Sequence, residues 1–384
     1  MDASISDADY QDRILPHVSR TFALTIPQLP LALRGAVTNA YLLCRVADTI
    51  EDETVISAAA TLGLLHRFVA VLYGREPAPG LVQDVLAQLS ERTLPAEREL
   101  VLNTGRVIAV TGSLRPPQRL AIQRCVEVMC AGMHQFQRTA SLRGLATMND
   151  LNDYCFYVAG VVGQMLTELF CDYSGDIGRQ RAGLQEFAVS FAQGLQMTNI
   201  LKDVWEDRSR GACWLPQDVF TRHGVDLGQL TGPGGDSRFD AGMRELIGIA
   251  HGHLRNALSF TLLIPARERG IRRFCLWAIG LAVLTLQRIA RTPGFNSGAQ
   301  VKVSRRAVAM TQLLTNLAVR SDWMLRGLFE RAASGLPLAP AAAVRRSPPR
   351  QGVQPARALA EPGAAALEVL PERAARRSEG RSGH

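Results

Sequence analysis

Apolar residues recur at helical spacing along most of the chain. In segment 35–52 they return every three or four positions, at Val37, Ala40, Leu43 and Ala47. Leu, Ala, Arg, Gln and Glu are abundant, and regular Val/Ile/Thr-rich alternation is absent; both features favour helices over strands. The pattern therefore predicts an all-α protein.

The helical pattern runs without a change of character from position 10 to position 336, so we expect a single helical domain there. Gly- and Pro-rich turns interrupt it at 27–30, 76–80, 115–117 and 232–236. Residues 1–9 are expected to be a flexible N-terminus. Residues 337–384 are rich in Ala, Pro and Arg without apolar periodicity, which predicts a disordered tail.

The net charge of the 384 residues is +8, and half of this excess comes from 341–384, where eight Arg face four Glu. The body is only mildly basic, which argues against a nucleic-acid surface and leaves an anionic small substrate or a membrane surface open. Of the 43 basic residues only Lys202 and Lys302 are lysines.

Cysteine and histidine patterns exclude other classes of site. The seven Cys form no CxxC pair, so we expect free thiols in a reducing, cytoplasmic setting. The seven His form no HExxH or HxxxH pattern, which argues against zinc; His251 and His253 are expected on the surface. The N-terminus is acidic and polar, unlike a signal peptide. The apolar run 274–286 is too short to span a bilayer and predicts a buried helix.

One acidic pattern occurs twice, as DTIED at 48–52 and DVWED at 203–207. The first lies at the end of predicted helix 35–52 and the second at the end of predicted helix 187–207. Residues at intervals of three and four share a helix face. The first stripe is Tyr41, Arg45, Asp48 and Asp52 beside Glu51, and the second is Gln196, Asn199, Asp203 and Asp207 beside Lys202 and Glu206.

Closely spaced carboxylates repel each other unless a cation lies between them. Mg²⁺ prefers one or two carboxylates together with water and substrate phosphates. Two facing stripes would therefore suit a diphosphate bridged by Mg²⁺, with Arg45 and Lys202 on the phosphate oxygens. A single such run is more often a solvated helix face; two runs, each within an apolar helix, favour a metal site.

Four motifs in order resemble the squalene/phytoene synthase family. They are SRTFA (Ser19–Ala23), YLLCRVADTIED (Tyr41–Asp52), YCFYVAGVVG (Tyr154–Gly163) and QMTNILKDVWED (Gln196–Asp207), the last followed by WLPQDVF. The resemblance covers nearly the whole body of the chain. It implies a helical bundle of the isoprenoid-synthase type around a central apolar cavity.

Within the family, VKVSR (Val301–Arg305) and TNILKD (Thr198–Asp203) look most like squalene synthases. The resemblance then implies head-to-head joining of two farnesyl diphosphates through presqualene diphosphate to squalene, with Mg²⁺ and NADPH as cofactors. It implies four sets of site residues. These are catalytic Tyr154, Tyr41, Phe22 and Phe274; diphosphate-binding Ser19, Arg20, Arg45, Gln196, Asn199 and Lys202; metal-binding Asp48, Glu51, Asp52, Asp203, Glu206 and Asp207; and NADPH-binding Lys302 and Arg305.

The chain departs from the family pattern in three places. Ala212 stands where the family has a phosphate-binding Arg, with Arg208 and Arg210 nearby. FCLWAI (Phe274–Ile279) stands where animal-type enzymes have FCAIPQ. The membrane anchor of the eukaryotic enzymes is missing, so the chain resembles a soluble bacterial member. We expect it in the cytoplasm, with peripheral membrane contact for product release.

Several alternatives remain open at this point. The enzyme could omit NADPH and form presqualene diphosphate, dehydrosqualene or phytoene. A non-catalytic scaffold would typically have lost the acidic motifs, and a chain-elongating prenyltransferase or terpene cyclase would lack SRTFA and YCFYVAG. Phe274 is either a cavity wall or plain core. Gly160 and Gly163 either let helices pack closely or leave room for a prenyl chain.

Overall fold

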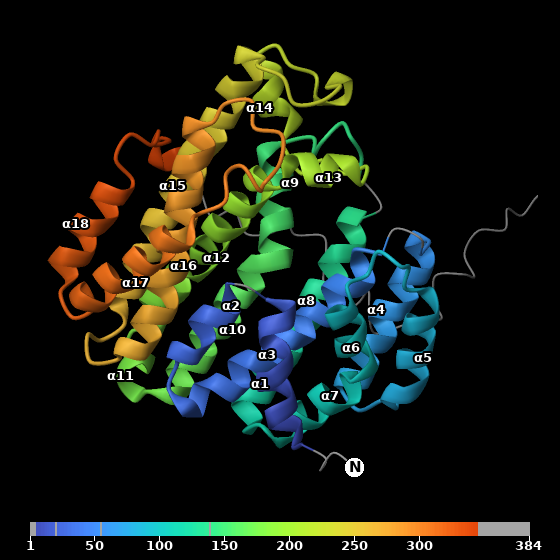
Figure 1. Cartoon of the computed structure of the whole chain (residues 1–384). Coiled ribbons are helices and arrows are strands. Elements are labelled where there is room, and N and C mark those ends of the chain that lie inside the picture. The colour runs from blue at the N-terminus through green and yellow to red at the C-terminus, as the bar shows by residue number, and fades with distance from the viewer. Residues whose placement is uncertain (1–4, 20, 54–55, 138–139, 345–384) are drawn as a thin grey trace, which may run out of the picture.

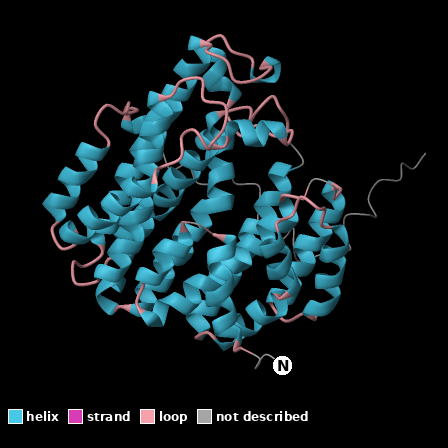
Figure 2. Cartoon of the chain, in the orientation of Figure 1, coloured by secondary structure: helices cyan, strands magenta, loops and turns pink. Residues whose placement is uncertain are grey.

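The computed structural model describes residues 5–19, 21–53, 56–137 and 140–344. Helices account for nearly all regular structure in these ranges, joined by short loops (Figures 1 and 2). Among the described residues there is no strand, and a single bridge pairs Leu145 with Pro216. The all-α prediction is confirmed. The predicted flexible N-terminus 1–9 and disordered tail 337–384 lie partly outside the described ranges, at 1–4 and 345–384.

Helices of the N-terminal half are α1 (Asp7–Val18), α2 (Phe22–Thr25), α3 (Leu31–Glu51), α4 (Ala58–Leu72), α5 (Ala78–Gln88), α6 (Pro95–Leu102), α7 (Thr104–Ser113) and α8 (Pro116–Gln137), with a 3₁₀ turn η1 (Ile26–Gln28). The central helices are α9 (Met148–Cys155), α10 (Val161–Tyr173), α11 (Gly175–Gly178), α12 (Arg181–Lys202), α13 (Val204–Ser209) and α14 (Gln217–Arg222), with η2 (Phe156–Gly160) and η3 (Leu227–Gln229). The C-terminal helices are α15 (Ser237–Leu263), α16 (Arg269–Arg291), α17 (Arg305–Ala318) and α18 (Asp322–Ala332), followed by η4 (Ala341–Val344).

The long helices form a closed ring. Helix α3 packs on α8, α8 on α10, α10 on α12 and α12 on α16. Helix α16 returns to α2 and η1, which in turn contact α3. Helices α4 to α7 cover the outside of this ring near α3, and α15, α17 and α18 cover it near α16 (Figure 1). The ring leaves an interior space, which holds the site described below.

The predicted Gly/Pro breaks all coincide with helix junctions: 27–30 covers part of η1 and precedes α3, 76–80 and 115–117 run into the first turns of α5 and α8, and 232–236 precedes α15. The second acidic helix was predicted as one piece from 187 to 207, and this is wrong. The structure ends α12 at Lys202 and begins α13 at Val204, with Asp203 between them at φ −98° and ψ 13°. Asp competes with helical hydrogen bonding, and closely spaced acids repel along a helix, so a break at this residue is physically reasonable.

The YCFYVAGVVG segment contains a short π-helix, η2, between α9 and α10. Such π turns are found mostly as local bulges at functional sites. A Cβ on Gly163 would lie 2.1 Å from the carbonyl oxygen of Ala188 in α12, and one on Gly160 would lie 3.1 Å from Val189. Both glycines therefore allow close packing of helices, and Gly163 also borders the cavity described below.

The prediction that His251 and His253 lie on the surface is wrong. Both are buried in α15, where the Nδ1 atoms lie 2.8 Å from the carbonyl oxygen of Pro337 and 2.7 Å from the Ser190 hydroxyl, respectively. A polar side chain can be buried between helices when its polar atoms form hydrogen bonds there, as these two Nδ1 atoms do.

All seven cysteines are free, as predicted, and six are buried. The apolar run at 274–286 forms the buried core of α16, also as predicted. By length and composition alone, 148–173 and 269–291 could each cross a membrane, but 67% of each apolar window is buried inside the protein. Both segments therefore have the character of core helices.

Candidate functional site

The ring of helices encloses a cavity of about 870 Å³. Its walls come from α2, α3, α8, α10, α12 and α16, with α9 and the loop after α13 at one end. That end carries the acidic motifs, and Tyr154 of α9 and Asp207 of α13 both line the cavity. Much of the remaining wall is apolar and includes Val37, Met129, Met165, Leu166, Phe191, Ile200, Phe274 and Ala278.

The first acidic stripe lies on α3. Leu42, Leu43, Val46 and Ile50 bury one face of this helix, so the opposite face points into the cavity. Tyr41, Arg45, Asp48, Glu51 and Asp52 all line the cavity, as predicted from their spacing.

Arg45 is held in place by two acids. Its guanidinium pairs with Glu97 at the start of α6, and it lies 3.7 Å from the Asp48 carboxylate. Glu97 was not predicted as a site residue. Nothing in its local sequence signals the role, because the pairing depends on α6 packing against α3.

The second acidic stripe spans the end of α12 and the start of α13. Gln196, Asn199, Lys202, Asp203 and Asp207 line the cavity. Lys202 Nζ lies 2.9 Å from an oxygen of Asp203. Although the helix breaks at Asp203, the residues before and after the break line the same cavity.

Glu206 does not line the cavity. Its Oε1 accepts a hydrogen bond of 2.7 Å from the backbone N–H of Gly298, in the loop between α16 and α17. Its Oε2 is buried and has no hydrogen-bond partner. A buried carboxylate oxygen without a donor is costly, and a bound cation would satisfy it.

The two stripes act on each other electrostatically. Burial raises the pKa of Glu51 well above its usual range, and the charges of Asp52, Asp48 and, from the other stripe, Asp207 raise it further. Burial raises the pKa of Asp207 to about 7, with further contributions from Asp203 and from Asp52 across the cavity. Carboxylates of the two stripes are therefore close enough for their charges to interact.

The pKa of Asp48 is also raised to about 7, chiefly by burial, although Arg45 opposes the shift. Asp203 and Asp52 have raised pKa values for the same main reason. A cluster of acids with raised pKa values in a cleft is the pattern expected where a cation or a proton must be bound.

Two aromatic pairs border the acidic end. Tyr154 stacks on Trp214 with ring centroids 4.3 Å apart and planes 6° apart. Tyr41 contacts Phe22 at 5.0 Å, and its hydroxyl donates a 2.9 Å hydrogen bond to the carbonyl oxygen of Val18. The Ser19 hydroxyl accepts a bond from the Phe22 N–H, which begins α2.

Phe274 is both core and cavity wall. Its side chain is buried and packs edge-on against Phe170 at 6.2 Å, yet it also borders the cavity. The two alternatives stated from sequence are therefore both true.

The structure separates the predicted site residues into two groups. Thirteen of them line the cavity: Phe22, Tyr41, Arg45, Asp48, Glu51, Asp52, Tyr154, Gln196, Asn199, Lys202, Asp203, Asp207 and Phe274. Ser19, Glu206, Lys302 and Arg305 do not line it, and Arg20 lies outside the described residues. Lys302 and Arg305 are exposed near the start of α17.

Two further residues enter the site. Arg210 lines the cavity. Its positive charge partly opposes the rise in pKa that burial causes at Asp52, Asp203 and Asp207. Arg208, by contrast, bonds to the backbone carbonyls of Leu142 and Leu230. Trp214 is the second addition; its place in WLPQDVF was a signal that could have identified it.

The side chains that line the acidic end of the cavity offer donor atoms that suit Mg²⁺. The cavity end presents carboxylate and amide oxygens, which hard cations prefer. Within the described ranges, no three His, Cys, Asp or Glu side chains converge tightly enough to hold an ion by themselves. An ion here would share its coordination among few carboxylates and other oxygen ligands, and Mg²⁺ commonly binds in this way.

Comparisons with known proteins agree with this geometry. The family model for squalene/phytoene synthases matches residues 15–307. A squalene synthase of Eremothecium gossypii is 28% identical over 276 residues, which are 71% of this chain and 60% of that protein. A squalene synthase of Candida albicans is 29% identical over 287 residues, 73% of this chain and 61% of that protein. The chain thus spans about 60% of the length of these curated relatives.

Solved structures show the same fold. A ligand complex of TcSQS superimposes with a TM-score of 0.68 at 23% identity, covering 88% of this chain and 94% of that chain. A dehydrosqualene synthase complex superimposes with a TM-score of 0.61 at 22% identity, covering 82% and 97%. The helical ring is therefore shared with both.

Proposed function

This chain belongs to the squalene/phytoene synthase family, and from that premise we propose that it joins two farnesyl diphosphates head to head to form squalene. The single observation that carries the proposal is the cavity, which is lined by carboxylates from both acidic motifs and by many apolar side chains. An isoprenoid diphosphate has the same division into a charged head and an apolar chain. A cavity of about 870 Å³ lies in the upper part of the usual range for ligand sites, ~300–1,000 Å³.

The diphosphate end is proposed to be held by carboxylates and bases together. Asp48, Glu51 and Asp52 on α3, with Asp203, Glu206 and Asp207 on the other side, would hold Mg²⁺. The ions would neutralise the charge that develops on the leaving diphosphate. The unpartnered Oε2 of Glu206 supports a cation on that side.

Basic and amide side chains would bind the phosphate oxygens directly. Arg45 and Lys202 line the cavity beside the carboxylates, with Gln196 and Asn199 along the same face of α12. Ser19 and Arg20 remain proposals from the SRTFA resemblance. We propose that Arg210 supplies the phosphate contact that Ala212 cannot make, because Arg210 lines the cavity while Arg208 is bound to backbone carbonyls.

In the first half-reaction the C1–O bond of one farnesyl diphosphate breaks, and the diphosphate leaves with the electron pair. The double bond of the second molecule then attacks C1, and loss of a proton closes the cyclopropane of presqualene diphosphate. Burial raises the pKa of Tyr154 well above its usual range, so the phenol stays neutral. A neutral phenol can accept this proton on oxygen while passing its own hydrogen to the departing diphosphate.

The carbocations need walls without nucleophiles. Phe22, Tyr41 and Phe274 line the cavity, and aromatic rings can stabilise cations through their faces. Most of the remaining apolar wall is formed by aliphatic and thioether side chains, together with Trp214 and the Cys44 thiol; walls of this kind exclude water.

The second half-reaction requires a hydride, which NADPH supplies when it is bound. Lys302 and Arg305 are proposed to bind its phosphates. The position of these two residues supports this assignment. The backbone N–H of Gly298, four residues before Lys302, donates a hydrogen bond to Glu206 of the second acidic motif, so the loop that precedes α17 lies against the proposed diphosphate end. Lys302→Ala should raise the KM for NADPH and leave presqualene diphosphate to accumulate, whereas Arg291→Ala, an exposed residue at the end of α16, should not.

We propose that the enzyme is cytoplasmic and contacts the membrane peripherally. The second candidate within the family is a synthase that omits NADPH and releases dehydrosqualene, phytoene or presqualene diphosphate. Purified protein supplied with farnesyl diphosphate and Mg²⁺, with and without NADPH, distinguishes them by the product identified. NADPH-dependent squalene supports the proposal, and a product independent of NADPH overturns it.

A further inference from the structure

Helix α17 carries an apolar stripe on its solvent side. Met310, Leu313, Leu314 and Leu317 follow at intervals of three, one and three, so they share one face of the helix. All four are exposed, with Leu313 at 53% and Leu317 at 70%. An amphipathic helix on a globular protein normally turns such a stripe toward the core. In α17 the stripe faces outward.

The inner face of α17 explains this orientation. It is made of small residues, with Thr315 and Ala318 buried. A Cβ on Gly280 of α16 would lie 2.5 Å from Cγ2 of Thr311, so α16 and α17 pack closely at this point. The hydroxyls of Thr311 and Thr315 bond to carbonyls within α17. The face of α17 with small side chains therefore packs against α16, and the large apolar side chains lie on the opposite, solvent-exposed face.

Helix α18 extends the apolar surface. Trp323, at its first turn, is 77% exposed, and Met324 beside it is also exposed. Its neighbour Asp322 is fixed by Arg272, a residue only 2% exposed, through a 2.8 Å bond. Arg272 also donates to the carbonyl of Val319 in the turn between α17 and α18. The turn is therefore rigidly anchored to α16, and Trp323 is held out from the protein.

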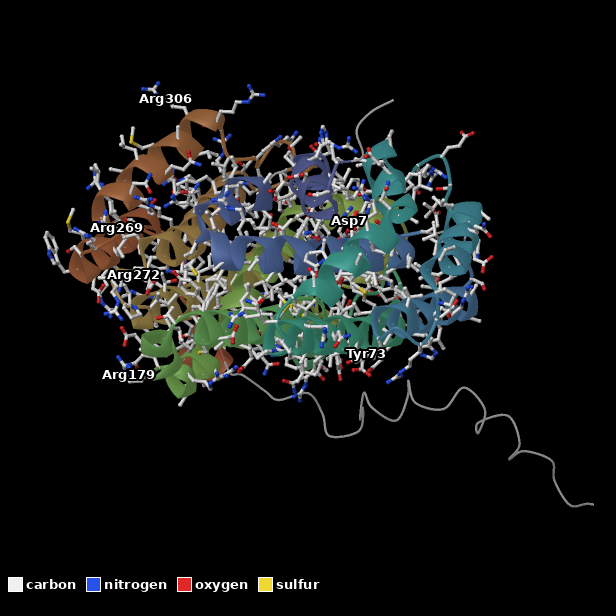
Figure 3. All side chains as sticks on the ribbon, turned by 90° about the horizontal axis from the view of Figure 1, so that it is seen from below. Asp7, Tyr73, Arg179, Arg269, Arg272 and Arg306 are labelled. Atoms are coloured by element: carbon white, nitrogen blue, oxygen red, sulfur yellow. The ribbon has the colours of Figure 1, made fainter. Side chains whose placement is uncertain are left out.

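Positive charge surrounds this surface. Arg305, Arg306, Arg320 and Arg326 are exposed, and none forms an ion pair with another described residue. Arg306 projects outward from the start of α17 (Figure 3). The acids of α18 are neutralised: Asp322 pairs with Arg272, and Glu330 pairs with Arg255.

We propose that the outward faces of α17 and α18 form a docking surface for an anionic lipid bilayer. Exposed Leu and Met with a peripheral Trp match the apolar side of an interfacial helix, and the flanking Arg match anionic headgroups. A second copy of this chain fits less well, because a twofold axis would bring the same unpaired Arg residues together. The surface is independent of the reaction proposed above, since its apolar residues do not line the cavity.

The apolar stripe is tested by flotation of the full chain with vesicles of equimolar phosphatidylcholine and phosphatidylglycerol. Leu313→Gln with Leu317→Gln should weaken binding by at least about tenfold, because each Leu loses burial in the bilayer. The matched control is Leu102→Gln with Leu120→Gln, which changes two Leu of similar exposure, 60% and 63%, on α6 and α8. The control should bind like the unchanged protein. Equal binding by all three proteins would overturn the proposal.

The charges are tested separately. Arg306→Gln with Arg320→Gln should weaken binding by about 25-fold at low salt, roughly fivefold for each Arg. Arg92→Gln with Arg291→Gln removes two exposed Arg elsewhere and should have a much smaller effect. Arg305 is left unchanged because it is also proposed to bind NADPH. Equal losses in both pairs would mean that net charge, rather than this surface, directs binding, which contradicts the proposal.

Light scattering in the absence of lipid tests the alternative that a second copy of this chain binds the surface, because it measures the mass of the protein in solution. The proposal expects the unchanged protein and the Leu313→Gln, Leu317→Gln variant to have the same mass. If the unchanged protein self-associates, the variant does not, and neither floats with vesicles, the surface is an interface between copies and the lipid proposal is wrong. Turnover of detergent-dispersed farnesyl diphosphate should be equal in the two proteins, which keeps this test distinct from that of the proposed reaction.

Discussion

Trp214 lies flat against Tyr154, with ring centroids 4.3 Å apart and planes 6° apart. Both side chains border the cavity, and Phe136 makes an edge contact with Tyr154 at a ring-centroid distance of 5.3 Å. The phenol proposed to move the proton therefore contacts two further rings. Offset stacking of this kind contributes about 0.5–1.5 kcal/mol beyond the area that it buries.

This contact predicts that Trp214 positions Tyr154. Trp214→Leu should lower kcat for presqualene diphosphate formation by about 10–100-fold, because a small displacement of a catalytic group is costly. Trp214→Phe retains a flat ring and should restore most of the rate. A purely structural role would instead lower thermal stability in both variants while the rate per folded molecule stayed unchanged, so activity and melting temperature are measured together.

The carboxylates of both stripes should be essential for turnover and dispensable for folding. Asp48→Asn, Asp52→Asn and Asp203→Asn should each lower turnover by about 100-fold or more, since each would weaken the charge stabilisation of the leaving group. Helical circular dichroism should not change. The control is Asp84→Asn on α5, an acid paired with Arg67 on the outer surface, which should keep full activity. Full activity in any of the three cavity variants contradicts the metal assignment.

The same carboxylates should make the metal-free protein less stable as pH rises. Burial raises the pKa values of Asp48 and Asp207 to about 7, from an ordinary value of 3.8. The folded state therefore binds more protons than the unfolded state between about pH 4 and pH 7, and the free energy of unfolding falls as pH increases through that window. Thermal unfolding at a series of pH values measures the slope.

Asp48→Asn combined with Asp207→Asn should flatten this pH dependence, and Asp84→Asn should not. Magnesium with pyrophosphate should also reduce the slope, because bound cations favour the ionised carboxylates. An identical slope in the double variant and the unchanged protein would show that these two groups do not carry the effect.

Close packing of α10 against α12 should depend on Gly163. Gly163→Ala would place a Cβ 2.1 Å from the carbonyl oxygen of Ala188, which should lower the free energy of unfolding by about 1–3 kcal/mol and also reduce activity, because both helices line the cavity. Gly63→Ala, in the middle of α4 with nothing within 4 Å of the added atom, should raise it by about 0.5–1 kcal/mol. Denaturant unfolding measures both, and a neutral Gly163→Ala would contradict the packing argument.

Local spacing was sufficient to predict the fold class and the first stripe. Asp48 shares a face with Arg45 on α3, and Asp52, the C-cap of that helix, keeps helical backbone angles, so their common direction follows from the helical repeat alone. Residue spacing was insufficient to predict features of the site that depend on contacts between different helices. The break at Asp203, the pairing of Arg45 with Glu97 and the burial of His253 beside Ser190 each depend on another helix.

The apolar pattern leaves one further feature undecided. Periodicity predicts that α17 is amphipathic, but it does not say which face is buried. Thr311 fits closely against Gly280, and this local fit turns the Leu stripe outward against the usual rule. Sequence spacing contains no record of the partner helix, so the exposed surface could be recognised only in the structure.

The most direct test of the central claim is a crystal structure with Mn²⁺ in place of Mg²⁺ and a non-hydrolysable farnesyl thiodiphosphate. Anomalous scattering would locate the ions. We predict that they lie between the carboxylates of α3 and those around Asp203 and Asp207, bridging to the diphosphate, with the farnesyl chain directed toward Phe274. Ions bound elsewhere, or a diphosphate held without any contact through metal to both stripes, would contradict it.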